Sequence, residues 1–307
     1  MGRVTVESLL SQARVRLTEA GIVEAELEAR LLAQETLRLG HAQLVAHQRE
    51  QVPPPVAAEL EALLRRRLQR EPLAYVLGWT EFYGRRFACD RRALVPRPET
   101  ETLVEAAVEV CRELEPGEWV ADVGTGSGVI AVTLALENPR LQLWATDVSG
   151  TALQVARLNV QRHRVAERVH LVEGSLLAPL LAPERAGQVA VVVCNLPYVP
   201  AGELARLQPE VRDWEPRQAL DGGPDGLRLC GELLRQAAGL PRLRALLLEV
   251  GHDQAAAVAH LAEANLPGAQ VRTYRDLQGV ERVVAARLPR AVPVLVPAGG
   301  LEAVGDG

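Results

Sequence analysis

The stretch that decides the fold lies between residues 120 and 130 and reads Val120-Ala121-Asp122-Val123-Gly124-Thr125-Gly126-Ser127-Gly128-Val129-Ile130. A short apolar strand runs directly into three closely spaced glycines, and a helical pattern begins at Val129. Glycines allow positive φ angles and let the backbone approach a ligand closely. The free N–H groups at a helix start point toward whatever occupies the turn. This unit predicts a ligand site at the carboxyl edge of a parallel sheet.

Strand-like and helix-like segments alternate from this unit to residue 288. Strands are predicted at 119–123, 141–146, 169–172, 189–194, 244–250, 271–274 and 282–286. The clear helices are predicted at 129–136, 152–161, 227–238 and 254–264, and another begins at Thr102. Strands that alternate with helices imply βαβ units and a parallel sheet. The turn around Gly279 is too short for a parallel crossover, so the last two strands should form an antiparallel hairpin.

The remaining segments divide the chain further. Residues 1–75 carry apolar side chains at helical spacing and predict a small helical domain, with helices near 5–17, 23–39 and 56–68. Residues 76–97 are rich in aromatic side chains and predict a hairpin linker, and 98–288 form the sheet domain. Residues 289–307 are rich in Pro, Gly and Ala and predict a flexible tail. The arginines at 65–67 and 70 are most simply a solvated helix face, with a partner-binding patch as the alternative.

Composition excludes several classes of protein. Of 307 residues, 48% are hydrophobic and 24% charged, a balance typical of globular proteins and not of disordered chains. The net charge of −5 argues against stable nucleic-acid binding, which needs a positive field. The four cysteines lack metal-site or paired spacing, and no signal-peptide pattern or apolar run of ~18 residues occurs. We therefore expect a cytoplasmic protein with no membrane partner and no metal.

The spacing of the glycines and one aspartate narrows the ligand. Gly-x-Gly-x-Gly differs from the dinucleotide fingerprint, and no Gly-Lys-Ser/Thr follows to make a phosphate loop. Asp147 ends the second strand, where a carboxylate can accept hydrogen bonds from both ribose hydroxyls of a nucleoside. The alternative is that Asp147 caps the helix that starts at Ala152. The combination favours a nucleoside-bearing cofactor, and both nicotinamide cofactors and S-adenosylmethionine fit at this point.

A second motif, Asn195-Leu196-Pro197-Tyr198, follows the fourth strand. The Asn195 side-chain oxygen and the Leu196 carbonyl can accept both hydrogens of an amide or a base amine. This turns the nitrogen lone pair toward an electrophile and stabilises the charge that develops on nitrogen. Pro197 stiffens the turn, and Tyr198 can supply a flat wall for a planar group. The sulfonium methyl of S-adenosylmethionine is the electrophile that this geometry serves.

With these motifs in place, the sequence resembles the PrmC/HemK family of protein-glutamine N5-methyltransferases. The resemblance extends to about Leu288 and includes residues 70–78, the segment Leu94-Val95-Pro96-Arg97-Pro98-Glu99-Thr100-Glu101, and residues 215–223 and 248–251. It implies a Rossmann-like α/β fold, with the seven-stranded class I methyltransferase sheet, an N-terminal helical bundle that docks the substrate, and a linking β-hairpin. It also implies methylation, with S-adenosylmethionine, of the glutamine in the Gly-Gly-Gln motif of class I peptide chain release factors.

The resemblance assigns residues to roles. It implies cofactor contacts at Gly124, Thr125, Gly126, Ser127, Gly128, Asp147, Leu176 (near the adenine) and Asn195. It implies catalytic and substrate contacts at Asn195, Leu196, Pro197 and Tyr198; Leu196 replaces the family's usual proline but keeps the carbonyl. Arg97, Glu99 and Glu101 either line the pocket, where Arg97 and Glu99 would contact substrate, or form a salt-bridge and capping cluster at the next helix. For Glu249 a structural role is favoured.

Three other functions stay open at this point. A ribosomal protein glutamine is a close competitor as the methyl acceptor. An adenine amine in DNA or RNA fits the same Asn-x-Pro-Tyr geometry, although the acidic net charge argues against it. A non-catalytic S-adenosylmethionine-binding scaffold is the third.

Overall fold

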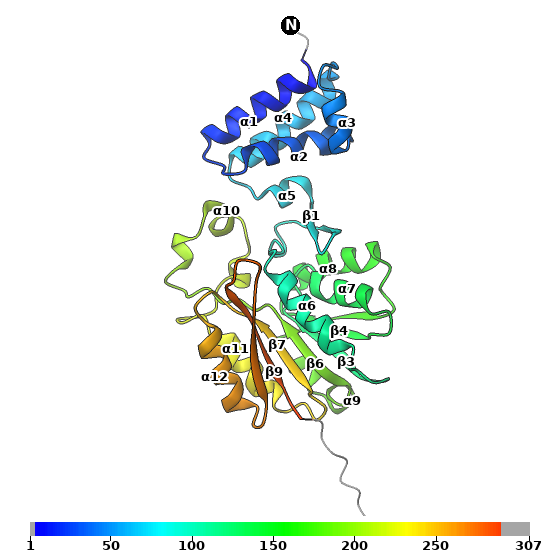
Figure 1. The fold of residues 1–307 in the computed structure, drawn as a ribbon, viewed down its shortest axis with the longest axis vertical. Helices are drawn as coiled ribbons and strands as arrows, with labels where there is room; N and C mark the ends of the chain where they lie inside the picture. The colour runs from blue at the N-terminus through cyan, green and yellow to red at the C-terminus, as the bar shows by residue number, and fades with distance from the viewer. Residues whose placement is uncertain (1–3, 290–307) are drawn as a thin grey trace, which may run out of the picture.

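The computed structural model describes residues 4–289, and it divides into a helical part and a sheet part (Figure 1). Residues 290–307, which hold nearly all of the predicted tail, lie outside the described residues. The blue and light-blue helices stand at one end of the molecule, and the sheet with its covering helices stands at the other. None of the helices within 4–289 combines the length and apolar character that a membrane span requires.

The helical part is built from α1 (Val6–Glu19), α2 (Ala25–Leu37), α3 (His41–Ala46) and α4 (Pro54–Leu68), and α5 (Leu73–Leu77) follows it. Leu17, Leu32 and Leu64 come from three different helices and meet in one buried cluster. The helices predicted around 5–17, 23–39 and 56–68 are confirmed. Helices α3 and α5 are additions, because six- and five-residue helices are too short to show a periodic pattern.

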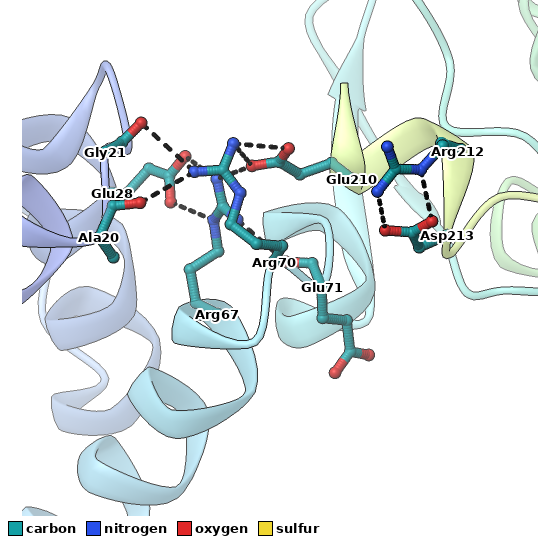
Figure 2. A network of polar contacts seen from close by, with 9 residues as sticks. All are labelled: Ala20, Gly21, Glu28, Arg67, Arg70, Glu71, Glu210, Arg212 and Asp213. Carbon is teal, nitrogen blue, oxygen red and sulfur yellow. Dashed lines mark hydrogen bonds and ion pairs between the residues drawn. The ribbon is translucent and has the colours of Figure 1, made fainter. Parts of the chain in front are cut away.

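The arginine run at the end of α4 is not the solvated face that the sequence suggested. The Arg67 side chain is only 6% exposed and lies between Glu28 of α2, at 2.5 Å, and Glu210 of the sheet part, at 3.0 Å (Figure 2). Arg70 reaches the same Glu210 at 2.8 Å. Arg65 matches the expectation, with two thirds of its side chain exposed, and Arg66 matches it in part, with 43% exposed and an ion pair to Glu71. The expectation failed because the partner of Arg67 and Arg70 is about 140 residues away in the chain.

A two-stranded hairpin, β1 (Trp79–Phe82) and β2 (Arg85–Ala88), connects the two parts, as the aromatic residues predicted. Phe82 and Phe87 are buried with their rings edge to face, and Phe87 also packs on His163, the residue that follows α8 (Gly150–Arg162). On the other side, the Trp79 indole donates a hydrogen bond to Glu35 of α2 at 3.0 Å. The hairpin is therefore packed against both parts of the molecule.

The sheet has seven strands in the order β5-β4-β3-β6-β7-β9-β8. The first five in this order are mutually parallel, and β9 runs antiparallel to both of its neighbours, so the predicted terminal hairpin is confirmed. The strands are β3 (Trp119–Val123), β4 (Leu143–Asp147), β5 (Val169–Glu173), β6 (Val189–Cys194), β7 (Ala245–Glu249), β8 (Gln270–Arg275) and β9 (Glu281–Arg287). All seven coincide with predicted strands to within two residues at each end.

Helices cover both faces of the sheet. Val191 and Val193 of β6 face the cluster formed with α6 (Thr100–Cys111), α7 (Val129–Glu137) and α8. Val192 and Cys194 face the opposite cluster, which includes α11 (Arg228–Ala237) and α12 (Ala255–Asn265). Successive side chains of a strand point to opposite faces, so a strand covered on both sides is apolar throughout. This explains why all six residues of β6 are fully buried.

Candidate active site

A cavity of about 430 Å³ opens where strands β3, β4, β5 and β6 end. The chain runs outward from β3 to β5 and then returns to β6 on the other side of β3, so this edge contains the topological switch point of the sheet. The sequence-predicted residues that line it are Gly124, Gly126, Asp147, Leu176, Asn195, Leu196 and Pro197. Thr125, Ser127, Gly128, Tyr198, Arg97 and Glu99 are not among the lining residues.

The glycine turn after β3 brings the backbone against the second motif. Gly124 has a φ of 74°, and a Cβ atom there would stand 3.0 Å from Cδ2 of Leu196. The N–H groups of Gly124 and Thr125 both donate to the carbonyl of Thr146, at 2.9 Å, so the turn is tied to the end of β4. Glycine is needed at 124 for both its positive φ and this close approach.

Asp122, in β3, stabilises the glycine turn, and this role was not predicted from the sequence. One carboxylate oxygen accepts hydrogen bonds from the Thr125 hydroxyl at 2.6 Å and from the Ala131 N–H at 3.0 Å. Burial is the main cause that raises the pKa of Asp122 to about 7. Asp122 is the one charged residue in the apolar strand β3, and a carboxylate in such a position indicates that it has hydrogen-bond partners in the fold. Its contacts link the glycine turn to the first turn of α7.

Asp147 presents its carboxylate to the cavity from the end of β4. One oxygen accepts the Gly126 N–H and the other accepts the Ser149 N–H, each at 2.8 Å. Each carboxylate oxygen has two lone pairs, so both keep an acceptor position for a ligand hydroxyl. Burial raises the pKa of Asp147, and these backbone hydrogen bonds limit the rise. The alternative capping role belongs to Ser149, whose side chain accepts from the Ala152 N–H.

Two apolar side chains give the cavity a surface suited to a planar base. Val148 lines the cavity and is 52% exposed, and Leu176 lines it from the segment after β5. Leu176 adopts a φ of 50°, and its carbonyl accepts the Thr146 hydroxyl at 2.9 Å. Together with Asp147 and the glycine turn, these residues fit a cofactor that carries a nucleoside.

Asn195 and Leu196 place two hydrogen-bond acceptors at the same cavity. The Asn195 side-chain Nδ2 donates to the Thr100 hydroxyl oxygen at 3.1 Å. Within residues 4–289, neither Oδ1 of Asn195 nor the carbonyl oxygen of Leu196 accepts a hydrogen bond. Both oxygens are therefore available to the hydrogens of a substrate NH₂ group.

The backbone after this motif is held by contacts from distant segments. The Gln254 side chain donates to the Tyr198 carbonyl at 2.9 Å, and the Gly222 N–H donates to the Val199 carbonyl at 2.9 Å. A Cβ atom at Gly222 would stand 2.8 Å from the Pro197 carbonyl, so close packing requires glycine there, and Gly223 adopts a positive φ of 93°. Burial raises the pKa of Tyr198 to about 12, which keeps its hydroxyl protonated.

Arg97, before α6, and Glu101, in its first turn, make structural contacts. Arg97 donates to Glu215 at 2.7 Å, and the Glu215 side chain is only 1% exposed. Glu101 accepts the Tyr83 N–H at 2.7 Å. Glu99 stands at the start of α6, where its side chain makes no capping hydrogen bond. The Arg97 ion pair is a contact of the kind that the sequence left open against a pocket-lining role, whereas Glu101 contacts the hairpin linker and caps no helix.

Comparison with known proteins identifies methyltransferase domains in this chain. The family model for the PrmC N-terminal domain matches residues 8–78, and the methyltransferase small domain matches residues 101–207. The fold is shared by the hMettl16 catalytic domain, solved in complex with MAT2A 3′UTR hairpin 1, at a TM-score of 0.56 and 15% identity over 84% of this chain and 93% of that one. The fold and site therefore define a class I methyltransferase whose methyl donor is S-adenosylmethionine.

Two curated relatives define the family. The release factor glutamine methyltransferase of Cereibacter sphaeroides is 44% identical over 90% of this chain and 96% of its own. That of Moorella thermoacetica is 41% identical over 90% of this chain and 93% of its own. The chain belongs to the family of release factor glutamine methyltransferases.

Proposed function

We propose that this chain transfers a methyl group to the side-chain amide nitrogen of the glutamine in the Gly-Gly-Gln motif of class I peptide chain release factors. The observation that carries the proposal is the pair of unused acceptors, Asn195 Oδ1 and the Leu196 carbonyl, at the cavity that holds Asp147. Family membership supports the choice of a protein glutamine as acceptor. A cytoplasmic location and docking of the release factor on the helical bundle are parts of the same proposal.

In the proposed reaction, S-adenosylmethionine supplies an electrophilic methyl group on a positively charged sulfur. The Asn195 side-chain oxygen and the Leu196 carbonyl accept hydrogen bonds from the two N–H groups of the glutamine amide. These bonds reduce delocalisation of the nitrogen lone pair and stabilise positive charge on nitrogen. The nitrogen bonds to the methyl carbon as the carbon–sulfur bond breaks and its electron pair passes to sulfur. The nitrogen then releases one proton to water. The chain supplies orientation and charge stabilisation, and no general base is required.

The test is radiolabelled methyl transfer into three purified acceptors side by side: a class I release factor, ribosomal proteins and nucleic acid. We expect label in the release factor alone, and none when its Gly-Gly-Gln glutamine is replaced by alanine. Asn195→Ala should lower kcat about 10²- to 10³-fold, as loss of a donor or acceptor to a developing charge does, and leave cofactor affinity nearly unchanged. Asn265→Ala, on the outer helix α12, is the matched control and should be fully active.

Two results would overturn the proposal. Label that appears in ribosomal proteins or nucleic acid, and not in the release factor, assigns a different substrate. Full activity of Asn195→Ala contradicts the role of its carboxamide.

A further inference from the structure

A buried polar chain runs behind the Asn195 carboxamide, away from the cavity. Thr100, the first residue of α6, is 2% exposed, and its hydroxyl oxygen accepts the Asn195 Nδ2–H at 3.1 Å. The carboxyl group of Glu249, which ends β7 and is 5% exposed, faces the same hydroxyl, and its Oε2 is buried and accepts no hydrogen bond from the described residues. Strands β6 and β7 are neighbours in the sheet, so their ends bring Asn195 and Glu249 to the same helix start.

The hydrogen-bonding capacity of these groups determines which way the Asn195 carboxamide faces. An ionised carboxylate can only accept, so Glu249, whose buried Oε2 has no other donor, draws the single hydroxyl proton of Thr100 toward itself. The Thr100 oxygen is then left with lone pairs and can only accept from Asn195. The NH₂ end of the carboxamide must point to Thr100. A flipped carboxamide would put Oδ1 of Asn195 against an oxygen that has no proton to offer.

We infer that Thr100 and Glu249 are positioning residues, which hold the carboxamide of Asn195 with Oδ1 toward the substrate nitrogen. The inference rests on the proposed function, since it assigns the groups that prepare its substrate-binding acceptor. An asparagine that could rotate freely would present its NH₂ group to the substrate NH₂ in part of the population, and two donors cannot pair. When the carboxamide is held in one orientation before the substrate binds, no fraction of the molecules presents the wrong group to it.

Ionisation of Glu249 should modulate this arrangement. Burial, with a smaller contribution from the negative charge of Glu99, raises the pKa of Glu249 to about 7. Thr100, Arg282 of β9 and Arg97 act in the opposite direction, and Tyr198 and Cys194 also lie within its electrostatic reach. Below that pH a protonated Glu249 can itself donate to the Thr100 oxygen, which frees the Thr100 proton to attract Oδ1. We therefore expect kcat to rise with pH through about 7.

The experiment compares Thr100→Val, which has the same shape without the hydroxyl, with Thr100→Ser, which restores it. Thr100→Val should lower kcat about 10- to 100-fold, as does loss of other groups that orient a ligand, with little change in KM for the release factor or in cofactor affinity. Thr100→Ser should recover most of the activity. Glu249→Gln carries a donor NH₂ beside its acceptor oxygen at every pH, as the protonated acid does, so kcat should stay near the low-pH value of the wild type and should lose the rise with pH.

A second readout does not depend on the substrate. With asparagine-selective ¹⁵N labelling, and with Asn195→Ala to assign the signal, the Asn195 side-chain NH₂ should show slow hydrogen exchange in the wild type and in Thr100→Ser, and fast exchange in Thr100→Val. Equal activity and equal exchange in the Val and Ser variants would overturn the inference. If the wild type methylates no release factor yet the exchange pattern holds, the proposed function fails and the positioning contact stands.

Discussion

The contact between the two parts of the molecule gives the most direct energetic test of the structure. Glu210, on the short helix α10 (Pro209–Arg212), inserts between Arg67 and Arg70 of the helical part (Figure 2). Glu28 of α2 is the other carboxylate of the group, so two positive and two negative charges balance. The change to make is Glu210→Gln, which removes one charge and nearly preserves shape.

The expected loss follows from burial and distance. Glu210 is 13% exposed and lies 3.0 Å from Arg67 and 2.8 Å from Arg70. At an effective dielectric constant of about 20, unit charges at 3 Å attract by about 5 kcal/mol, and desolvation of the carboxylate offsets part of this. Removal of one partner of a buried pair costs about 3–5 kcal/mol. Glu28 still neutralises Arg67, so we expect the lower end, a loss of about 3 kcal/mol in free energy of unfolding.

The assay is urea unfolding followed by circular dichroism, with slopes compared before midpoints are converted to free energies. Asp213→Asn is the matched control. The partner of Asp213 is Arg212, which lies on α10 with Glu210, and the side chains of Arg212 and Asp213 are both close to half exposed. Breaking an exposed pair of this kind should leave the urea midpoint nearly unchanged, because solvent screens the two charges. Equal losses in the two variants would refute the reasoning, as would a coupling energy near zero in a double-mutant cycle with Arg67→Gln.

Acid should erase the difference between wild type and Glu210→Gln. Burial acts to raise the pKa of Glu210, but hydrogen bonds from its own backbone, Arg67 and Arg70 outweigh it and hold the pKa below its usual value. A lowered pKa in the folded state contributes stability above the unfolded-state value of about 4.3, and that contribution is lost as pH falls through the folded-state pKa. The two proteins should therefore begin to converge in stability as pH falls below about 4.3, and the difference should vanish once pH lies below the lowered folded-state pKa.

Two further predictions concern the site. Gly124→Ala combines a positive φ with a contact at 3.0 Å to Leu196, and should weaken S-adenosylmethionine binding about tenfold by calorimetry. Gly117→Ala, which has a similar φ of 86° and open space around it, should cost stability alone; equal losses of affinity would contradict this. For Glu249, a folded-state pKa of about 7 means that stability present below pH ~4.5 is lost as pH rises to about 7, by a few kcal/mol. Glu249→Gln should lack this loss when unfolding is compared at pH 5 and pH 8, and parallel curves would rule the argument out.

Local pattern was sufficient for most of the fold. The strand, glycine turn and helix at 120–130 appear as predicted, because apolar periodicity and glycine conformation act over a few residues. All seven strands were predictable for the same reason, and so was the antiparallel end of the sheet, since a short turn cannot make a parallel crossover. Asp147 and Asn195 were identifiable because parallel strands bring their carboxyl ends to one edge.

The amino-acid sequence by itself determined where the strands lie along the chain and which residues follow their carboxyl ends. Only the tertiary structure decided which polar groups support those residues. Thr100 and Asn195 are 95 positions apart, and Arg67 and Glu210 are 143 apart, so no periodic pattern relates either pair. Each pair meets because packed helices and strands bring distant segments together, and burial then makes a contact between polar groups energetically necessary.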